Sequence, residues 1–140
     1  MVTGASKGIG AAIARALGAE GASVVVNYAS SKTGAEKVVE SIRASGGTAV
    51  AVKADVSKAA EARALIDDTL KAFGRVDVLV NNSGVYEFAP LEAITDESFD
   101  RMFNVNVRGL LNVTQAASKH LSEGGSVINI GSGVTRITPP

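Results

Sequence analysis

Short apolar runs rich in β-branched residues alternate with helical patterns along the 140 residues. Each run is continuously apolar, which is typical of strands that are buried on both faces of a sheet. Alternation of strand and helix favours right-handed crossovers between parallel strands. We therefore predict one α/β domain, residues 1–140, with a doubly wound parallel sheet and helices on both faces. The predicted strands are Ser23–Asn27, Thr48–Val52, Val76–Val80 and Ser126–Ile130.

Helix boundaries can be read from capping signals. Thr33 and Glu36 match a capping box at the start of the second helix, and Thr95 is an N-cap candidate for a longer fourth helix. Glycines mark the ends of the first three helices. These glycines are Gly21, the pair Gly46-Gly47, and Gly74.

Both ends of this pattern look cut. The first strand can only be Met1–Thr3, which is too short for a central position in a sheet. Ten residues without a helical pattern follow Ser126–Ile130. We therefore expect an N-terminal fragment of a longer protein, truncated at both ends.

Composition excludes several classes of site and partner. The chain has no Cys and a single His, so thiolate chemistry and a metal centre are not expected. Its 14 basic residues balance its 14 acidic residues, which argues against nucleic acid as a partner. No apolar run is long enough to span a membrane, and no signal segment opens the chain, so we expect a cytoplasmic location.

A glycine-rich turn, residues 3–10, lies between the first strand and the first helix. Glycines let backbone N–H groups and the helix N-terminus approach an anion, and a diphosphate is the natural ligand. Taken alone, such a turn is as often only a tight strand–helix connection. Its G-x-x-x-G-x-G spacing also differs from the G-x-G-x-x-G dinucleotide fingerprint.

Three motifs in order resemble the short-chain dehydrogenase/reductase family. They are T-G-x-x-x-G-I-G from Thr3 to Gly10, Asp55-Val56, and Asn81-Asn82-Ser83-Gly84 (N-N-A-G in the family). Each follows a predicted strand, where open α/β sheets bind ligands. The resemblance implies a Rossmann-type fold that binds a nicotinamide dinucleotide. Within the family, the sequence is similar to bacterial glucose 1-dehydrogenases and 3-oxoacyl carrier-protein reductases.

The charge after the second strand favours NADP over NAD. A site for NAD places a carboxylate there, which binds the ribose 2′-hydroxyl and repels a 2′-phosphate. Residues 27–32, N-Y-A-S-S-K, contain no acid. The predicted cofactor-binding residues are Thr3, Gly4, Ser6, Lys7, Gly8, Ile9, Gly10, Asn27, Ser30, Asp55, Val56, Asn81, Ser83 and Gly84.

The resemblance also implies two catalytic residues. Ser132 matches the serine that orients the carbonyl, and Asn106 matches the helix asparagine of the proton relay. Without the resemblance, a turn hydroxyl and a structural amide are the better interpretations. His120 is not expected to act as the base of a Ser-His-Asp hydrolase, because no Ser lies in a G-x-S-x-G nucleophile elbow. Its position fits a helix C-terminus, where a cation is favourable.

The family's catalytic Tyr, with a Lys four residues later, has no match here. Tyr28 and Lys32 have the spacing, but Tyr28 belongs to a strand end, where the two side chains do not share a helix face. Tyr86 has Pro90 in place of the Lys. In the family this Tyr follows the Ser after a short loop, beyond residue 140.

We therefore expect part of an NADP-dependent oxidoreductase that interconverts a carbonyl and a secondary alcohol on a small molecule, inactive without its Tyr and Lys. The alternative is a dinucleotide-binding module without turnover. Family members often form homodimers or homotetramers, and we expect this largely through helices beyond these residues. Tyr86, Phe88 and Leu91 line the substrate mouth or simply pack the loop.

Overall fold

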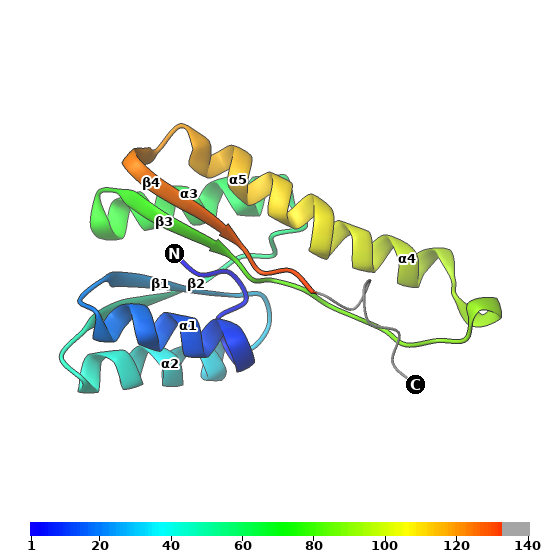
Figure 1. Cartoon of the computed structure of the whole chain (residues 1–140), viewed down its shortest axis with the longest axis horizontal. Coiled ribbons are helices and arrows are strands. Elements are labelled where there is room, and N and C mark those ends of the chain that lie inside the picture. Colours follow the sequence, from blue (N-terminus) through cyan, green and yellow to red (C-terminus); the bar gives the residue numbers. More distant parts are fainter. Residues whose placement is uncertain (133–140) are drawn as a thin grey trace.

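The computed structural model describes residues 1–132, and its helices and strands alternate as the sequence predicts (Figure 1). The elements are α1 (Gly8–Ala19), β1 (Ser23–Tyr28), α2 (Lys32–Ala44), β2 (Thr48–Lys53), α3 (Ala59–Phe73), β3 (Val76–Asn81), the 3₁₀ turn η1 (Leu91–Ala93), α4 (Asp96–Phe103), the π-helical segment η2 (Asn104–Gly109), α5 (Leu110–Ser118) and β4 (Leu121–Asn129).

The strands are parallel, and the N-terminal residues join two pairs into one sheet. β1 pairs with β2, and β3 pairs with β4. Val2 forms parallel bridges to Val26 of β1 and to Val80 of β3. The order across the sheet is therefore β2, β1, Val2, β3, β4. The prediction that Met1–Thr3 is too short for a central position is wrong, because the full-length strands on both sides give it backbone hydrogen bonds.

Helices cover both faces of the sheet, which confirms the doubly wound architecture (Figure 1). α1 and α2 cover one face, where a cluster of apolar side chains includes Val26 and Val80. α3 and α5 cover the other, with Val25 and Leu79 in a second cluster. Neighbouring residues of one strand thus enter different cores, as the alternation of side chains requires.

Two of the capping signals have different outcomes. Thr95 caps α4, and its side chain and that of Ser98 form a reciprocal capping box. The predicted box at Thr33 and Glu36 is wrong. α2 already begins at Lys32, so Thr33 lies within its first turn and not at the N-cap. Glu36 Oε1 lies 3.6 Å from Lys32 Nζ and forms an ion pair with it.

The last strand differs from its prediction in length and in burial. β4 begins at Leu121, five residues before the predicted start. Its pairing with β3 has a register shift between Val76 and Val78 of β3. From Glu123 onward its side chains are exposed. The prediction that all strands are buried on both faces is therefore wrong for β4, which lies at the edge of the sheet that residues 1–132 form.

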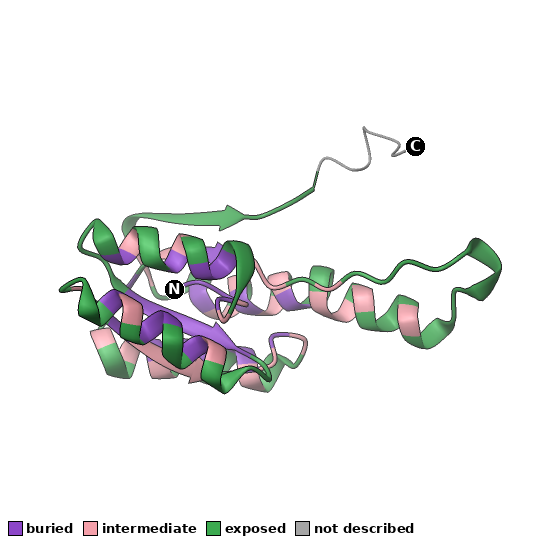
Figure 2. Cartoon of the chain, turned by 90° about the horizontal axis from the view of Figure 1, so that it is seen from below, coloured by how far each residue is buried: buried purple, intermediate pink, exposed green. Residues whose placement is uncertain are grey.

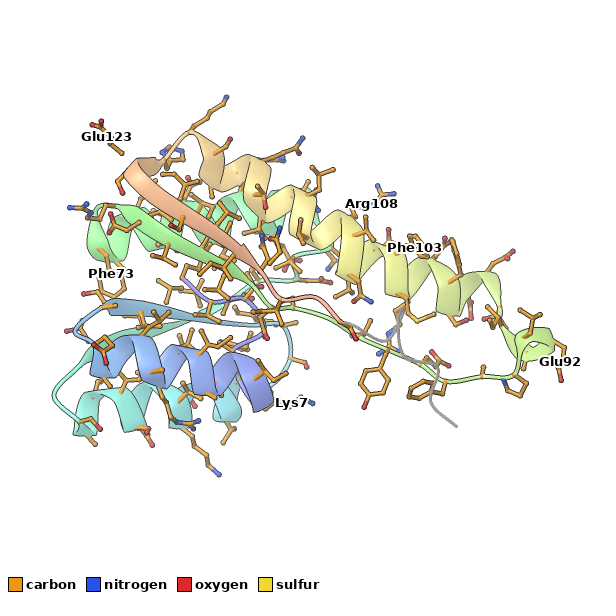
Figure 3. The ribbon with its side chains drawn as sticks, viewed as in Figure 1. Lys7, Phe73, Glu92, Phe103, Arg108 and Glu123 are labelled. Carbon is orange, nitrogen blue, oxygen red and sulfur yellow. The ribbon has the colours of Figure 1, made fainter. Side chains whose placement is uncertain are left out.

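α4, η2 and α5 follow one another without a break and extend beyond the sheet (Figures 1 and 2). The loop from β3 runs outward beside this helix to the tip of the extension, and its residues are largely exposed. Figure 3 places Glu92 at the tip of this extension and Lys7 at the start of α1. The carboxyl ends of the strands thus lie between the glycine-rich turn and α4.

Candidate cofactor and reaction site

The glycine-rich turn has the backbone that close approach of a ligand requires. Gly4 and Gly8 have φ values of +60° and +56°, a region that other residues rarely adopt. Lys7 precedes α1 in an extended conformation and makes no side-chain cap. The first N–H groups of α1 therefore lack a capping side chain from Lys7, and a side chain built at Gly8 would meet nothing within 4 Å.

Asn82 holds this turn in place. Its Nδ2 donates to the carbonyl oxygens of Thr3 (3.0 Å) and Gly4 (3.1 Å). The Thr3 hydroxyl accepts from the backbone N–H groups of Asn82 (2.9 Å) and Ser83 (3.0 Å). A Cβ at Gly10 would lie 2.6 Å from the Gly4 carbonyl oxygen and would also overlap Asn82 Nδ2. Asn82 is thus a positioning residue, which belongs to the N-N-S-G motif but is not among the predicted cofactor-binding residues.

Asn27 lies beneath the site rather than in it. Its side chain is buried, its Oδ1 accepts from Gly4 N–H (3.1 Å), and its Nδ2 donates to the carbonyls of Val52 (3.3 Å) and Ala54 (3.1 Å). These bonds use the amide to join β1, β2 and the glycine-rich turn. The amide is thus turned into the protein, and Asn27 lines neither of the cavities described below, so its contact with a cofactor stays a prediction.

The loop after β2 is fixed by its own acidic residues. Asp55 Oδ1 accepts from the N–H (3.1 Å) and hydroxyl (2.7 Å) of Ser57. Glu61 Oε2 accepts from Asp55 N–H at 2.7 Å, and this bond, together with one from Lys58, holds the pKa of Glu61 below its ordinary value. Val56 is thereby kept buried at the edge of the site.

Two cavities meet along the carboxyl ends of the strands. The larger, of about 700 Å³, is bordered by the glycine-rich turn, the end of β1 and the loops after β2 and β3. The second, of about 550 Å³, lies between β3, β4 and η2. The two share six lining residues and therefore form one groove. The shared residues are Ile9, Val56, Asn82, Ser83, Gly84 and Tyr86.

All predicted site residues except Asn27 line this groove. Ser132 and Asn106 border the second cavity together with Thr3 and Asn81. The remaining predicted residues border the first cavity, the second or both. They are Gly4, Ser6, Lys7, Gly8, Ile9, Gly10, Ser30, Asp55, Val56, Ser83 and Gly84. Ser31, Arg101 and Val105 also line the first cavity, although no motif pointed to them.

Asn106 anchors the loop that follows Gly84. Its Oδ1 accepts from Val85 N–H, and its Nδ2 donates to the Val85 carbonyl, both at 2.8 Å. The residue is exposed rather than enclosed by apolar neighbours, and it lies in η2, a π-helical segment of a kind frequent at functional sites. Its amide is thus occupied by the backbone, as the structural interpretation of this residue supposes.

Asn81 joins three elements at the floor of the second cavity. Its Nδ2 donates to Thr114 Oγ1 of α5 (3.0 Å) and to Asn129 Oδ1 of β4 (2.9 Å). Ile130 N–H donates to the Asn81 carbonyl at 2.9 Å. The side chain therefore fixes the end of β4, three residues before Ser132. Among residues 1–132, no group donates to its buried Oδ1.

The pair Tyr28 and Lys32 is confirmed as a coincidence of spacing. Tyr28 is the last residue of β1 and is buried, whereas Lys32 is the first residue of α2 and is exposed.

Within the described residues no group of three or more His, Asp or Glu side chains is placed to hold a metal ion. The same residues contain no helix long and apolar enough to cross a membrane.

A profile of the short chain dehydrogenase family matches residues 1–140. The chain belongs to this family. An uncharacterized oxidoreductase of Methylorubrum extorquens is 65% identical over 140 residues, which are all of this chain and 56% of that protein. The chain spans about half the length of the curated relatives it matches.

Two solved structures of relatives contain a nicotinamide cofactor. A short chain dehydrogenase from Burkholderia cenocepacia in complex with NADP superposes with a TM-score of 0.94 at 42% identity, covering 99% of this chain and 57% of that one. A blue fluorescent protein from a metagenomic library in complex with NADPH gives 0.90 at 41% identity, covering 96% and 56%. These matches confirm the Rossmann-type fold that the resemblance implied.

Proposed function

We propose that this chain is the cofactor-binding part of an NADP-dependent oxidoreductase that transfers hydride between the nicotinamide and a carbonyl or secondary alcohol. The observation that carries the proposal is the continuous groove from the glycine-rich turn to Ser132. It offers a phosphate cradle at one end and a hydroxyl at the other. The solved relatives that hold NADP and NADPH support this choice of cofactor.

The residues of the groove fit a dinucleotide. The open face of Gly8 and the helix N-terminus behind it suit the diphosphate. Asp55 and Val56 border the part of the groove that suits the adenine, and Ser83 and Gly84 lie where the two cavities meet. The nicotinamide would then face the second cavity.

The end of β1 supports NADP over NAD. Ser30 and Ser31 offer hydroxyl donors to a 2′-phosphate, and Lys7 adds a cation across the same cavity. No carboxylate lies between Asn27 and Lys32, so nothing in that segment repels the phosphate. Lys32 lies near Glu36 and does not line the cavity.

Ser132 and Asn106 have different roles in this proposal. The Ser132 hydroxyl would donate a hydrogen bond to the carbonyl oxygen as negative charge develops on it. Asn106 holds the Val85 backbone, so it acts by positioning the loop beside the reacting groups. Bound NADPH supplies the hydride. The proton for the alkoxide must come from an acid, for which the family resemblance implies a Tyr with a Lys four residues later.

Cofactor choice can be tested by titrating NADPH and NADH into the chain and following nicotinamide fluorescence. We expect NADPH to bind more tightly. Ser30→Asp should reverse the preference by about tenfold, because a carboxylate there repels the 2′-phosphate and accepts from a 2′-hydroxyl. Ser45→Asp, on the exposed end of α2, is the control. Tighter binding of NADH by the unaltered chain would refute the choice of NADP.

The 140 residues contain no Tyr and Lys at helical spacing on one helix face, which favours a second candidate, a dinucleotide-binding module without turnover. We expect no measurable reduction of a ketone by the chain alone. Turnover within tenfold of a full-length relative would contradict the assignment of the acid to a residue that these 140 lack.

We also propose that the protein self-associates through α4 and α5. Phe99, Phe103, Val107 and Leu111 form an apolar row at four-residue spacing, and each is about half exposed. Acidic residues lie at the start of the helix (Asp96, Glu97 and Asp100), where the basic Arg101 faces Glu87 of the loop, and basic residues lie toward its end (Arg108 and Lys119). Two copies crossing antiparallel would pair opposite charges around the row. This would place the interface earlier in the chain than our sequence analysis expected.

A further inference from the structure

Four of the six aromatic side chains of the chain lie exposed within residues 86–103. They form two pairs. The rings of Tyr86 and Phe88 meet edge to face, with centroids 5.4 Å apart, and those of Phe99 and Phe103 stack at 4.2 Å. Exposed rings gathered in one region usually mark a surface that something covers. The first pair lies on the loop after β3 and the second on α4, so one covering partner need not account for both.

Only the first pair borders the groove. Tyr86 lines both cavities, whereas Phe99 and Phe103 line neither. Phe88 packs against Tyr86 from outside and is 90% exposed. Tyr86 is itself 83% exposed. Because it lines both cavities, it stands where the cofactor cavity meets the cavity that contains Ser132.

The backbone that precedes Tyr86 is held by Asn106 of η2. Asn106 binds the N–H and the carbonyl of Val85, and a Cβ at Gly84 would lie 3.5 Å from Asn106 Oδ1. After Tyr86, the exposed carboxylate of Glu87 lies 4.0 Å from the guanidinium of Arg101 of α4, and an exposed ion pair of this kind adds little. The Asn106 bonds thus fix the backbone that immediately precedes Tyr86, which lowers the loop ordering that a stacking ligand must offset.

The chemistry of this wall points to one class of substrate. An aromatic ring in contact with another ring gains about 0.5–1.5 kcal/mol beyond what area burial supplies, whereas a saturated ring gains only the burial. Ile9, Leu110 and Ile130 line the same cavity and offer apolar contacts to either kind of ring. The aromatic pair is therefore the part of the cavity that can distinguish the two.

We propose that Tyr86, supported by Phe88, is an aromatic wall that selects substrates whose carbonyl is carried on a flat aromatic ring system. The proposal rests on the proposed function, because it assumes that the cavity beside Ser132 is where a carbonyl is reduced. It adds a substrate class and a specificity-determining residue to that function.

The test compares two ketones with the same fused carbon skeleton, 2-tetralone with one aromatic ring and 2-decalone with none. Each is titrated into the ¹⁵N-labelled chain with NADPH present, and Kd is measured from amide shifts. We expect the tetralone to shift the amides around Tyr86 and to bind more tightly. The double variant Tyr86→Leu/Phe88→Leu keeps apolar volume and should weaken tetralone binding about three- to tenfold, with decalone changed less than twofold.

Two variants complete the comparison. Tyr86→Phe keeps the ring and should retain the selectivity. Phe99→Leu/Phe103→Leu removes the other aromatic pair and should leave both affinities unchanged. Equal losses for the two ketones, no loss in the Tyr86 double variant, or the same loss in the Phe99 double variant would each overturn the aromatic wall.

The proposed function fails separately. Binding of NADPH is followed by its own fluorescence before either ketone is added. If NADPH does not bind, the proposed oxidoreductase function is overturned. The preference for the aromatic ketone is then measured by the same ketone titration without cofactor. NADPH binding without preference for the tetralone would overturn only the wall.

Discussion

One side of the groove is formed by the glycine-rich turn and the other by α4 and β4. The first side buries polar side chains, and the second exposes apolar ones. On the first side, the polar side chains of Thr3 and Asn27 are buried and bonded to backbone. On the second, the apolar side chains of Phe103 and Ile128 face outward, being 50% and 47% exposed. The buried polar side chains of the first side are thus already bonded, whereas the second side presents apolar surfaces that ligands or other protein can cover. Substitutions should accordingly affect folding on the first side and association on the second.

The largest effect is expected from Asn27→Asp. The carboxylate would face the carbonyls of Val52 and Ala54 without a proton to donate, in a site that water does not reach. We expect a loss of about 3 kcal/mol in the free energy of unfolding, measured by urea denaturation. Ser30→Asp, three residues later and exposed, should leave this free energy nearly unchanged.

This pair of variants separates structure from cofactor choice. If Asn27→Asp kept its stability and instead shifted preference toward NADH, Asn27 would be a ribose contact after all. The burial of its amide would then not describe the protein with cofactor bound.

A second comparison uses one substitution on each side. Gly10→Ala should cost about 2 kcal/mol, because the new Cβ would overlap Asn82 Nδ2 and the Gly4 carbonyl, and the gain in helix propensity offsets only about 1 kcal/mol. Gly131→Ala, next to Ser132, meets nothing within 4 Å and should change stability by less than about 0.5 kcal/mol. Thermal melting measures both, and equal effects would contradict the difference between the two sides.

Sequence patterns predicted the glycine-turn side well because its signals are local. The turn and the buried strands each follow from spacing within a few residues, and T-G-x-x-x-G-I-G lies where a ligand can approach. What the sequence does not reveal are contacts between distant residues. Asn27 lies in the segment whose lack of acid favours NADP, but bonds to β2 and to Gly4 turn its amide away from the groove. Asn82 is recognised as a positioning residue only once its bonds to Thr3 and Gly4 are seen.

The other side was harder to predict because its residues depend on partners that a sequence pattern does not specify. The run Ser126–Ile130 is as apolar as the buried strands, yet it lies at a sheet edge and is exposed. Asn106 sits among apolar residues in sequence and is exposed in space, since the π-helical segment presents it to the loop. Periodicity identifies which residues are apolar, and the strand order decides which of them are covered.

Phe103→Asp tests whether the exposed apolar row on α4, η2 and α5 is an interface. A charge at the centre of the row should disfavour association by about tenfold or more in Kd, with little change in the stability of the monomer. Sedimentation at increasing protein concentration measures this. Phe88→Asp, an equally drastic change on the loop, is the matched control and should not alter association. A chain that stays monomeric before substitution would refute the proposed interface.

The smallest effect should come from Asp77, which links β3 to β4 at the register shift. It accepts from Arg75 (2.6 Å) and from the Ser122 hydroxyl (2.5 Å), and these bonds hold the pKa of Asp77 below its ordinary value. A carboxyl whose pKa is lower in the folded state stabilises the fold above its unfolded pKa, about 3.9, and loses that contribution as the pH falls through the lowered value. Asp77→Asn should therefore lower the melting midpoint by about 1–2 °C at pH 7, and the difference should shrink as the pH falls through the lowered pKa of Asp77. Asp68→Asn, whose partner Lys71 lies in the same helix, should have a smaller effect because no strand pairing depends on it. A difference between Asp77→Asn and the unaltered chain that persists at low pH would mean that the side chain acts through its shape and hydrogen bonds rather than through its charge.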